Sequence, residues 1–386
     1  MNIEVTRKQI TSSCLGVMMW CKKYCNIVFV MVILYDHQVF SWQKVGGISR
    51  YFVELIKNLP YGFFNKNSIL YSDNAYIDEI NLHHFTMPSF KGKERIYEYA
   101  NRMSSILTIT TSKFDIFHPT YYNPYFLKYL KKPYVITVHD MIHEKFVDIL
   151  KDKKTIKNKK HTIENASKII AVSENTKKDI MDIYGIDGKR ISVVYHGYSF
   201  NKKTIVPIRN LPSKYILYVG ARKGYKNFFR FLEAFSLINK VHNDIILICT
   251  GNRFDDEEQR ILSRYGLRDK VQSSYVTDGE LAYLYQNALC FVYPSLYEGF
   301  GIPILEAFAA KCPLALSNTS CFPEIAKDAG AYFNPYDYSS IAHTILNIIE
   351  NKEYRSNLIQ KGTSIVSNYS WAETGYQTAR IYGALQ

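Results

Sequence analysis

Two carboxylates, Glu298 and Glu306, lie with seven residues between them in the segment YEGFGIPILEAF. A carboxylate accepts hydrogen bonds at both of its oxygen atoms, and two neighbouring hydroxyl groups of a sugar or a ribose can donate them. Two glycines and one proline separate the acids. Because glycine and proline are the poorest helix formers, we expect a break between the acids rather than one continuous helix.

We expect this break to aim the two acids into one pocket. The strand Leu289–Ser295 ends shortly before Glu298, which places this acid on a loop. Proline suits the first position of a helix, so Pro303–Ala310 is predicted to be helical, with Glu306 in its first turn. The unpaired amides around Gly301–Ile304 would then suit a phosphate. The alternative is that Glu306 only complements the positive end of the helix dipole.

A second segment with anion-binding character is YVGARKGYKNFF. In it, Gly220 ends a strand, and Arg222 and Lys226 follow in the turn before a helix. An arginine can bind two phosphate oxygens at once, whereas a lysine acts as a point charge. Both suit a diphosphate, although two cations near a turn also occur without any ligand. Lys223 is interpreted as a bystander that faces solvent.

Glycines and histidines mark the first half of the chain. Gly46 and Gly47 follow the first strand and precede a helix, where they either permit close approach of a ligand or simply form a tight turn. His139 ends the strand in VITVHD and is either a site residue or a structural histidine. His118 ends another strand and is the weaker candidate.

Several classes of chemistry find no support in the sequence. No Asp-x-Asp pair follows a strand to hold a metal-bound diphosphate, so we expect fixed cations in that role and no metal or other cofactor. No G-x-G-x-x-G segment favours dinucleotide binding, and no nucleophile elbow is visible. Of the seven cysteines, only Cys21 and Cys25 are close in sequence, and nothing completes a zinc pattern.

An alternation of strands and helices must position these residues, and it is typical of parallel sheets with crossover helices. In the first half, the expected strands are Ile27–Tyr35, Phe114–His118, Tyr134–His139, Ile169–Val172 and Ile191–Tyr195, and the expected helices include Ile48–Leu59 and Glu174–Tyr184. In the second half, the further expected strands are Tyr215–Gly220, Asp244–Gly251, Ser273–Val276 and Pro313–Asn318, and the further helices are Asn227–Ile238, Asp255–Tyr265 and Asp278–Asn287.

We therefore predict an α/β fold with two Rossmann-like, doubly wound domains that face a central cleft. In such sheets, ligands bind at the carboxyl ends of the strands. A length of 386 residues also exceeds what one hydrophobic core usually supports. The predicted parts are an N-terminal extension at 1–30, a first domain at 31–200, a linker at 201–213, a second domain at 214–368 and a last helix at 369–386.

The net charge of +13 is confined to the first half. Residues 1–213 contain 31 Lys and Arg against 18 Asp and Glu, whereas residues 214–386 contain 17 of each. Seven of these lysines gather in Lys151–Lys168. This segment is either a solvated helix face or a surface for an anionic membrane or an acidic acceptor. Nucleic acid is not expected, because no nucleic-acid-binding motif accompanies the charge.

Seven segments together resemble the retaining glycosyltransferase family 4, also called glycosyl transferases group 1. They are VGGISRYF, ITVHD, IIAVSENTKKDI, YVGARKGYKNF, YPSLYEGFGIPILEAF, SNTSCFPEIAKDAGAYFNPYD and YSWAETGYQTARIY. The resemblance covers about residues 31–386 and implies the GT-B fold, with an acceptor-binding first domain and a nucleotide-sugar-binding second domain. Its last helix, Trp371–Leu385, would cross back to the first domain. The family usually has glycine where Lys311 ends a helix, which questions the local stability there.

The resemblance also implies roles for single residues. Glu298 would contact the donor sugar, and Glu306 would hold the ribose hydroxyls. Arg222 and Lys226 would bind the diphosphate and stabilise its charge as it leaves, while His139 would lie beside the reacting sugar. The remaining positions would be Gly220, Phe300, Gly301, Ile302, Pro303 and Ile304 at the donor, Tyr275 and Val276 beside the base, and Gly46 and Gly47 in a loop near the diphosphate and the acceptor.

We therefore expect a cytoplasmic glycosyltransferase that moves a hexose, with mannose as one candidate, from a nucleotide-diphosphate sugar to a glycan or lipid-linked acceptor in cell-surface polysaccharide synthesis. The anomeric configuration would be retained, and the basic first domain would contact the inner face of the membrane. Two alternatives stay open. One is a nucleotide-sugar epimerase or phosphorylase of the same fold, although no segment matches the pyridoxal lysine of a phosphorylase. The other is a non-catalytic nucleotide-sugar-binding protein, against which the intact acids argue.

Overall fold

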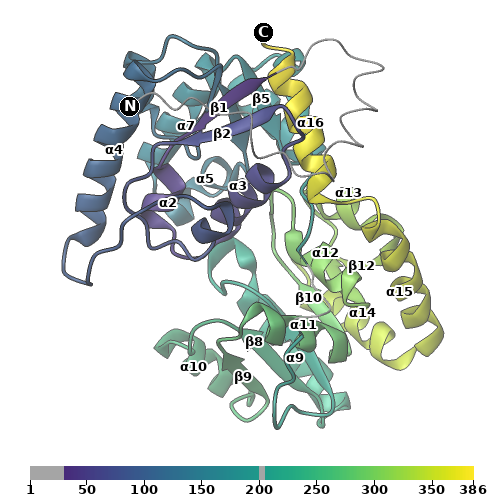
Figure 1. Cartoon of the computed structure of the whole chain (residues 1–386). Helices are drawn as coiled ribbons and strands as arrows, with labels where there is room; N and C mark the ends of the chain where they lie inside the picture. The colour runs from purple at the N-terminus through teal and green to yellow at the C-terminus, as the bar shows by residue number, and fades with distance from the viewer. Residues whose placement is uncertain (1–29, 200–204) are drawn as a thin grey trace, which may run out of the picture.

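The chain forms two α/β halves in a computed structural model that describes residues 30–199 and 205–386 (Figure 1). The predicted extension at 1–30 and part of the predicted linker at 201–213 therefore lie outside the described residues. Every strand pair in the described part of the chain is parallel. Parallel strands bring their carboxyl ends to one edge of a sheet, which is where the candidate site residues were expected.

The first half has the strand orders β2-β1-β3 and β4-β5-β6, and a parallel bridge between Phe117 and Tyr134 links the two groups. The strands are β1 (Met31–Tyr35), β2 (Phe63–Asn67), β3 (Ile116–His118), β4 (Val135–Val138), β5 (Lys168–Ala171) and β6 (Ile191–Val193). The helices are α2 (Gln38–Trp42), α3 (Gly47–Lys57), α4 (Lys93–Thr111), α5 (Ile142–Lys145), α6 (Val147–Leu150), α7 (Lys153–Asn165) and α8 (Glu174–Tyr184), with the 3-10 turns η1 (Ile77–Ile80), η2 (Pro124–Lys128) and η3 (Gly188–Arg190).

The second half is built on a sheet of strand order β12-β11-β10-β7-β8-β9. The strands are β7 (Tyr215–Tyr218), β8 (Ile246–Thr250), β9 (Val271–Ser274), β10 (Cys290–Tyr293), β11 (Leu314–Ser317) and β12 (Gly330–Phe333). The helices are α9 (Phe228–Val241), α10 (Asp256–Arg264), α11 (Asp278–Asn287), α12 (Ile302–Ala309), α13 (Phe322–Ala326), α14 (Tyr338–Glu350), α15 (Lys352–Val366) and α16 (Trp371–Gly383), with the 3-10 turns η5 (Gly224–Lys226) and η6 (Lys327–Ala329).

The expected elements are present, and α8 and α11 have the predicted bounds. Most strands are shorter than predicted, since apolar residues continue into the loops that leave the sheet. The strand predicted at Ser273–Val276 is shifted, because β9 ends at Ser274 and leaves Tyr275 and Val276 in the loop. Several elements were not predicted, among them β2, β12, α4, α14 and α15.

Helix α4 shows why such an element escapes a search for apolar periodicity. Its buried side includes the polar residues Asn101 and Ser105. Its apolar residues Tyr99, Met103 and Leu107 are instead 70%, 50% and 62% exposed. Apolar residues therefore lie on both sides of α4, because Tyr97 and Ile109 are buried in the same helix, and no single apolar stripe marks it as a surface helix.

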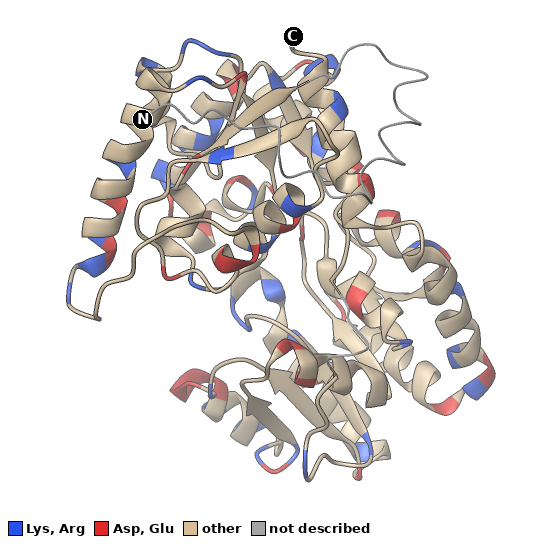
Figure 2. Cartoon of the chain, viewed as in Figure 1, with Lys and Arg blue, Asp and Glu red and all other residues tan. Residues whose placement is uncertain are grey.

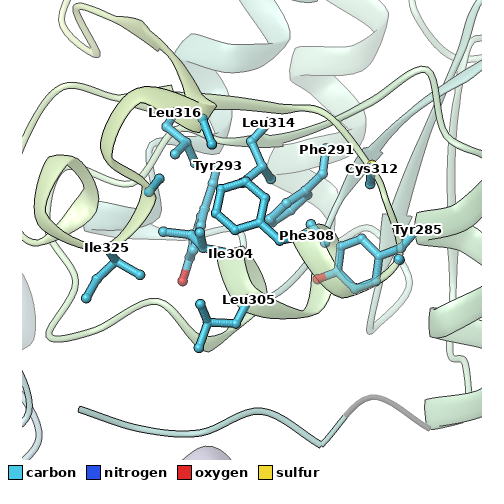
Figure 3. Packing of buried hydrophobic residues seen from close by; sticks show 14 of the residues in the cluster. Tyr285, Phe291, Tyr293, Ile304, Leu305, Phe308, Cys312, Leu314, Leu316 and Ile325 are labelled. Atoms are coloured by element: carbon cyan, nitrogen blue, oxygen red, sulfur yellow. The ribbon is translucent and has the colours of Figure 1, made fainter. Parts of the chain in front are cut away.

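The core of the second half holds α12 against β10 and β11 (Figure 3). Ile304 and Leu305 of α12 are fully buried there, and burial of each such side chain contributes about 1.5–3 kcal/mol. Lys311, which follows α12 where the family usually has glycine, has a φ of 60°. Glycine adopts this left-handed conformation at a helix end without strain, whereas lysine does not. The structure therefore gives a physical reason for the reduced local stability that we expected at Lys311.

Helix α16 returns to the first half (Figure 1). The hydroxyl of Tyr382 lies 2.6 Å from Nδ1 of His118 and 3.0 Å from the hydroxyl of Tyr35. A Cβ on Gly375 would overlap the carbonyl of Asn58, just after α3, so the two helices lie in direct backbone contact. Over residues 30–199 and 205–386, none of the helices combines the length and the hydropathy that crossing a bilayer requires.

Candidate functional site

An ion pair joins the loops that follow two neighbouring strands, β7 and β10. Nζ of Lys226 lies 2.6 Å from Oε1 of Glu298, and both side chains are largely buried. The amide of Leu296 donates to the carbonyl of Tyr225, which ties the two loops together. Burial opposes the charge on Lys226, but Glu298, Tyr225 and Asp140 together outweigh it, so the pKa of Lys226 is raised. The strand edge therefore carries a fixed cation and a fixed carboxylate.

The glycine after Glu298 brings this loop onto the first half. A Cβ on Gly299 would overlap the carbonyl oxygen of His139 at the end of β4, so only glycine fits there. The carbonyl of Gly299 accepts hydrogen bonds from Ser173 Oγ at 2.7 Å and from Thr176 Oγ1 at 3.2 Å. The sequence analysis missed Ser173 and Thr176, since nothing in a sequence shows which distant carbonyl a helix cap will bind.

His139 lies in a cluster of rings that includes His196, a residue that the sequence analysis also missed. The ring of His139 lies 5.0 Å from that of Tyr51 and 6.0 Å from that of His196, and His196 contacts Phe300 at 4.7 Å. His139 Nε2 and His196 Nδ1 are buried and have no hydrogen-bond partner in the described part of the chain. Burial lowers the pKa of His139 to about 4 and that of His196 well below its usual value, so both are neutral at pH 7.

Arg222 is held by partners of its own half. Its Nε lies 2.7 Å from Oε1 of Glu258, and its Nη2 donates to Oε2 of the same carboxylate and to the carbonyl of Asn252 at 2.8 Å. Its remaining nitrogen, Nη1, makes no hydrogen bond to the described residues and lies near Gly251. Most of this guanidinium is thus committed to Glu258. The predicted diphosphate contact of Arg222 stays a prediction and is limited to Nη1.

Glu306 lies one residue further along its helix than predicted. Because α12 begins at Ile302, Glu306 is its fifth residue and not in the first turn. This position weakens the alternative that Glu306 only complements the helix dipole. Burial raises the pKa of Glu306, Arg50 opposes that shift and Asp278 adds to it. Arg50 reaches across from α3 to pair with Asp278 at 3.1 Å, so residues of both halves surround Glu306.

The predicted glycines differ in the space around them. A Cβ on Gly47 or Gly220 would meet no atom within 4 Å, so both leave open space, and the φ of 116° at Gly220 also favours glycine. A Cβ on Gly46 would overlap the side chain of Gln43. Gly301 caps α12 with a φ of 87°. Gly47 and Gly220 are thus the positions where a ligand could approach the backbone.

The other predicted donor-binding residues fall into two groups. Phe300 and Ile304 are 4% and 0% exposed, so they belong to the core, and only their backbone could reach a ligand. Ile302 and Pro303 are half-buried at the start of α12. Tyr275 is 75% exposed, and Val276 is half-buried. Among the described residues, no group of three or more His, Cys, Asp or Glu side chains could hold a metal ion.

Comparison with known proteins matches both halves of the chain. The family described as Glycosyltransferase Family 4 matches residues 45–202, and the family described as Glycosyl transferases group 1 matches residues 201–364. The chain is 28% identical to O-antigen chain mannosyltransferase B of Escherichia coli over 370 residues, which are 88% of this chain and 96% of that protein. It is 30% identical to O-antigen chain mannosyltransferase RfbU of Salmonella typhimurium over 213 residues, or 55% and 58% of the two chains.

Solved structures share the whole fold. Sucrose-phosphate synthase from Thermosynechococcus elongatus superposes with a TM-score of 0.72 at 18% identity and covers 92% of this chain and 98% of its own. Anabaena HepE in complex with UDP-glucose has a TM-score of 0.73 at 16% identity, with 92% and 100% covered. The chain is a group 1 glycosyltransferase with the GT-B fold.

The family and the fold class predicted for this glycosyltransferase are therefore confirmed, whereas the domain boundaries and the roles of single residues stay predictions. The structure brings the predicted residues Lys226, Glu298 and His139 to one place, through the contact of Gly299 with the end of β4. It keeps Arg222 in a separate ion pair with Glu258.

The glycosyltransferase should lose stability as the pH falls from about 6.5 towards 4. Burial lowers the pKa of His139 to about 4 and that of His118 to about 3, from 6.5 in the unfolded chain. The unfolded chain thus binds more protons in this range, and each such histidine lowers the free energy of unfolding by about 1.4 kcal/mol per pH unit. Urea unfolding at pH 7.5, 6 and 5 measures the slope. His139→Gln should reduce it, whereas the exposed His161→Gln is the control. Equal stability at pH 7.5 and 5 would contradict the prediction.

Proposed function

We propose that this glycosyltransferase transfers mannose from a nucleotide-diphosphate sugar to a glycan or lipid-linked acceptor in cell-surface polysaccharide synthesis, with retention of anomeric configuration. Two relatives named as O-antigen mannosyltransferases support the sugar and the type of product. HepE, whose structure holds UDP-glucose, supports a nucleotide-sugar donor. The observation that carries the proposal is the buried pair of Lys226 and Glu298 beside His139.

In the proposed reaction, the bond between the anomeric carbon and the diphosphate oxygen breaks, and negative charge develops on that oxygen. Lys226 stabilises this charge from a fixed position in the turn η5, so it needs no reorganisation during the step. Glu298 binds hydroxyl groups of the sugar as positive charge develops on it. The free Nε2 of neutral His139 offers a further hydrogen bond to the sugar, and Glu306 binds the ribose.

Lys226 also bears on the cofactor requirement. A glycosyltransferase that holds the diphosphate through Mg²⁺ or Mn²⁺ uses the metal to neutralise the leaving group. Here we propose that Lys226 supplies this positive charge, with a smaller contribution from Nη1 of Arg222, and that the reaction needs no metal. Both cations lie in the segment between β7 and α9.

Contact with an anionic membrane surface is a further part of the proposal. Helix α7 and the turn before it carry exposed lysines at positions 151, 153, 154, 157 and 160, and Lys and Arg are drawn in blue in Figure 2. Lys159, in the same predicted segment, is instead fully buried and pairs with Glu144 at 2.9 Å, so it belongs to the fold. Exposed lysines near a surface attract anionic lipids. The exposed apolar face of α4 would suit the interface of a bilayer.

A transfer assay tests the proposed reaction. GDP-mannose and an α-linked mannotriose should give a new α-linked product by proton NMR, with UDP-glucose as the alternative donor. EDTA should leave the rate unchanged, because Lys226 supplies the charge at the leaving group. Loss of activity with EDTA and recovery with Mg²⁺ or Mn²⁺ would contradict the metal-free proposal, and a β-linked product would contradict retention. A donor epimer formed without acceptor would favour the epimerase.

Substitutions of Glu298 and Glu306 should affect the enzyme in different ways. Glu298→Gln should not weaken nucleotide binding, because it removes the carboxylate that competes with the diphosphate for Lys226. It should lower turnover by roughly 10²-fold, the scale of one preorganised electrostatic group. Glu306→Ala should weaken the binding of the nucleoside diphosphate by about 1–3 kcal/mol, because it removes charged hydrogen bonds that are present with both the substrate and the transition state. Calorimetry and turnover assays separate the two, with the exposed Glu353→Gln as control. If Glu298→Gln weakened nucleotide binding and Glu306→Ala did not, the two roles would be reversed. Full activity in both variants would show that neither acid belongs to the active site.

Vesicle binding tests the membrane contact. The double substitution Lys153→Gln and Lys157→Gln should weaken co-sedimentation with vesicles of phosphatidylglycerol and phosphatidylcholine, each lysine contributing about 1 kcal/mol near the surface. The control is Lys240→Gln with Lys352→Gln, which changes the net charge equally in the second half. Binding should also weaken as salt rises. If both double variants bind like the unchanged chain, the lysines are only a solvated helix face.

A further inference from the structure

A cavity of about 360 Å³ lies in the first half, apart from the Lys226–Glu298 pair. Residues of α2, α4 and α7 line it, together with the loop that follows β3. It sits towards the carboxyl end of β3, since the loop Tyr121–Asn123 comes shortly after that strand. No role was predicted for this cavity, and none of its lining residues was among the candidate site residues.

A buried histidine with a free nitrogen lines the cavity. His37 is 3% exposed, and its Nδ1 lies 3.0 Å from Oγ of Ser41. Its Nε2 is buried and has no hydrogen-bond partner in the described part of the chain. Buried polar atoms are almost always paired, so an orphan nitrogen in a cavity wall points to a missing polar partner. A hydroxyl group of a ligand would supply that partner.

Aromatic rings form another part of the wall. Trp42 is 49% exposed, and its ring lies 5.3 Å from that of Tyr121 in an edge-to-face arrangement. Tyr121 in turn lies 4.6 Å from Tyr122. A sugar ring has an apolar face of C–H groups that packs on an aromatic face, while its hydroxyl groups need polar partners at the edge. Exposed aromatic rings next to hydrogen-bonding groups fit that shape of ligand.

The charges around the cavity argue against an anionic ligand. Glu94, Glu98 and Asp152 line it, against only Arg95 and Lys154. Glu94 and Glu98 make no hydrogen bond or ion pair to other described residues and are exposed. A phosphate or diphosphate would be repelled by the excess of carboxylates. Free carboxylates instead accept hydrogen bonds from the neutral hydroxyl groups of a saccharide.

The side chain of Tyr122 contacts both the cavity and a residue of the candidate active site. Tyr122 lines the cavity, and its hydroxyl accepts a hydrogen bond from the backbone N–H of His139 at 3.1 Å. His139 in turn carries the carbonyl on which Gly299 lies. The cavity is therefore separated from the end of β4 by one side chain, that of Tyr122.

We propose that this cavity is a subsite for a neutral sugar residue of the acceptor, with Trp42 stacking on the ring and His37 Nε2 binding a hydroxyl group. The assignment rests on the proposed function, in which the acceptor is a saccharide. It places the charged part of any lipid-linked acceptor elsewhere, since the rim is acidic. In this proposal the protein recognises the acceptor by its sugar residues and not by a phosphate group.

Binding to the full chain is measured first, without any donor. An α-linked mannotriose should change the tryptophan fluorescence and give saturation-transfer NMR signals. The chain contains three tryptophans, so Trp42→Phe should abolish the fluorescence change while NMR still reports binding. Trp42→Ala and His37→Gln should each weaken binding by 10-fold or more, whereas Tyr61→Ala, at a residue 84% exposed outside the cavity, should not. No binding to the unchanged chain, or displacement of the sugar by inorganic diphosphate, would overturn the proposal.

Kinetics separate this proposal from the proposed function. Trp42→Ala and His37→Gln should raise the acceptor KM by 10-fold or more, with little change in kcat or in the slow hydrolysis of donor without acceptor. An unchanged acceptor KM in both variants would overturn the subsite, even if transfer occurs. Absence of any donor turnover in the unchanged chain would instead contradict the proposed function, and the binding measurements would still decide whether the cavity takes a sugar.

Discussion

The rest of the site depends on the contact between Gly299 and the backbone of His139. Any side chain at position 299 would overlap the carbonyl of His139. The same glycine accepts hydrogen bonds from the side chains of Ser173 and Thr176 at the start of α8. This one residue therefore joins the loop after β10 to β4 and α8 of the other half. It places Glu298 directly beside the end of β4, where the reaction is proposed to occur.

Charged contacts reinforce this arrangement on either side. The carboxylate of Glu324 accepts hydrogen bonds from the amides of Glu174 and Asn175 at 2.7 and 3.1 Å, and thereby caps α8 from the second half. An acid at a helix start is stabilised by the helix dipole. Arg50 reaches in the opposite direction to Asp278. Such pairs contribute little net stability when exposed, so their effect is mainly to fix how the two halves meet.

The sequence predicted the elements better than it predicted the contacts between them. Strand ends follow from local apolar patterns, and so Lys226, Glu298 and His139 were placed on the correct edges. The partner of Arg222 could not be predicted, because Glu258 lies 36 positions away and competes with any ligand for the guanidinium. His196 escaped notice because a short strand precedes it, and only burial against Phe300 makes it unusual. Glu306 was placed in the first turn, and not just after it, because the helix start was set at Pro303 rather than at Ile302.

The pair of Lys226 and Glu298 also bears on how a charged donor could enter a buried site. An unpaired buried cation would cost several kcal/mol, and removing one partner of a buried pair is strongly destabilising. When no donor is bound, Glu298 forms an ion pair with Lys226 and balances its charge. In the proposed reaction the diphosphate would replace Glu298 as the partner of Lys226, and the carboxylate would turn to the hydroxyl groups of the sugar. Each charge then exchanges one partner for another, so neither is left unpaired, and the desolvation cost of both has already been met by folding.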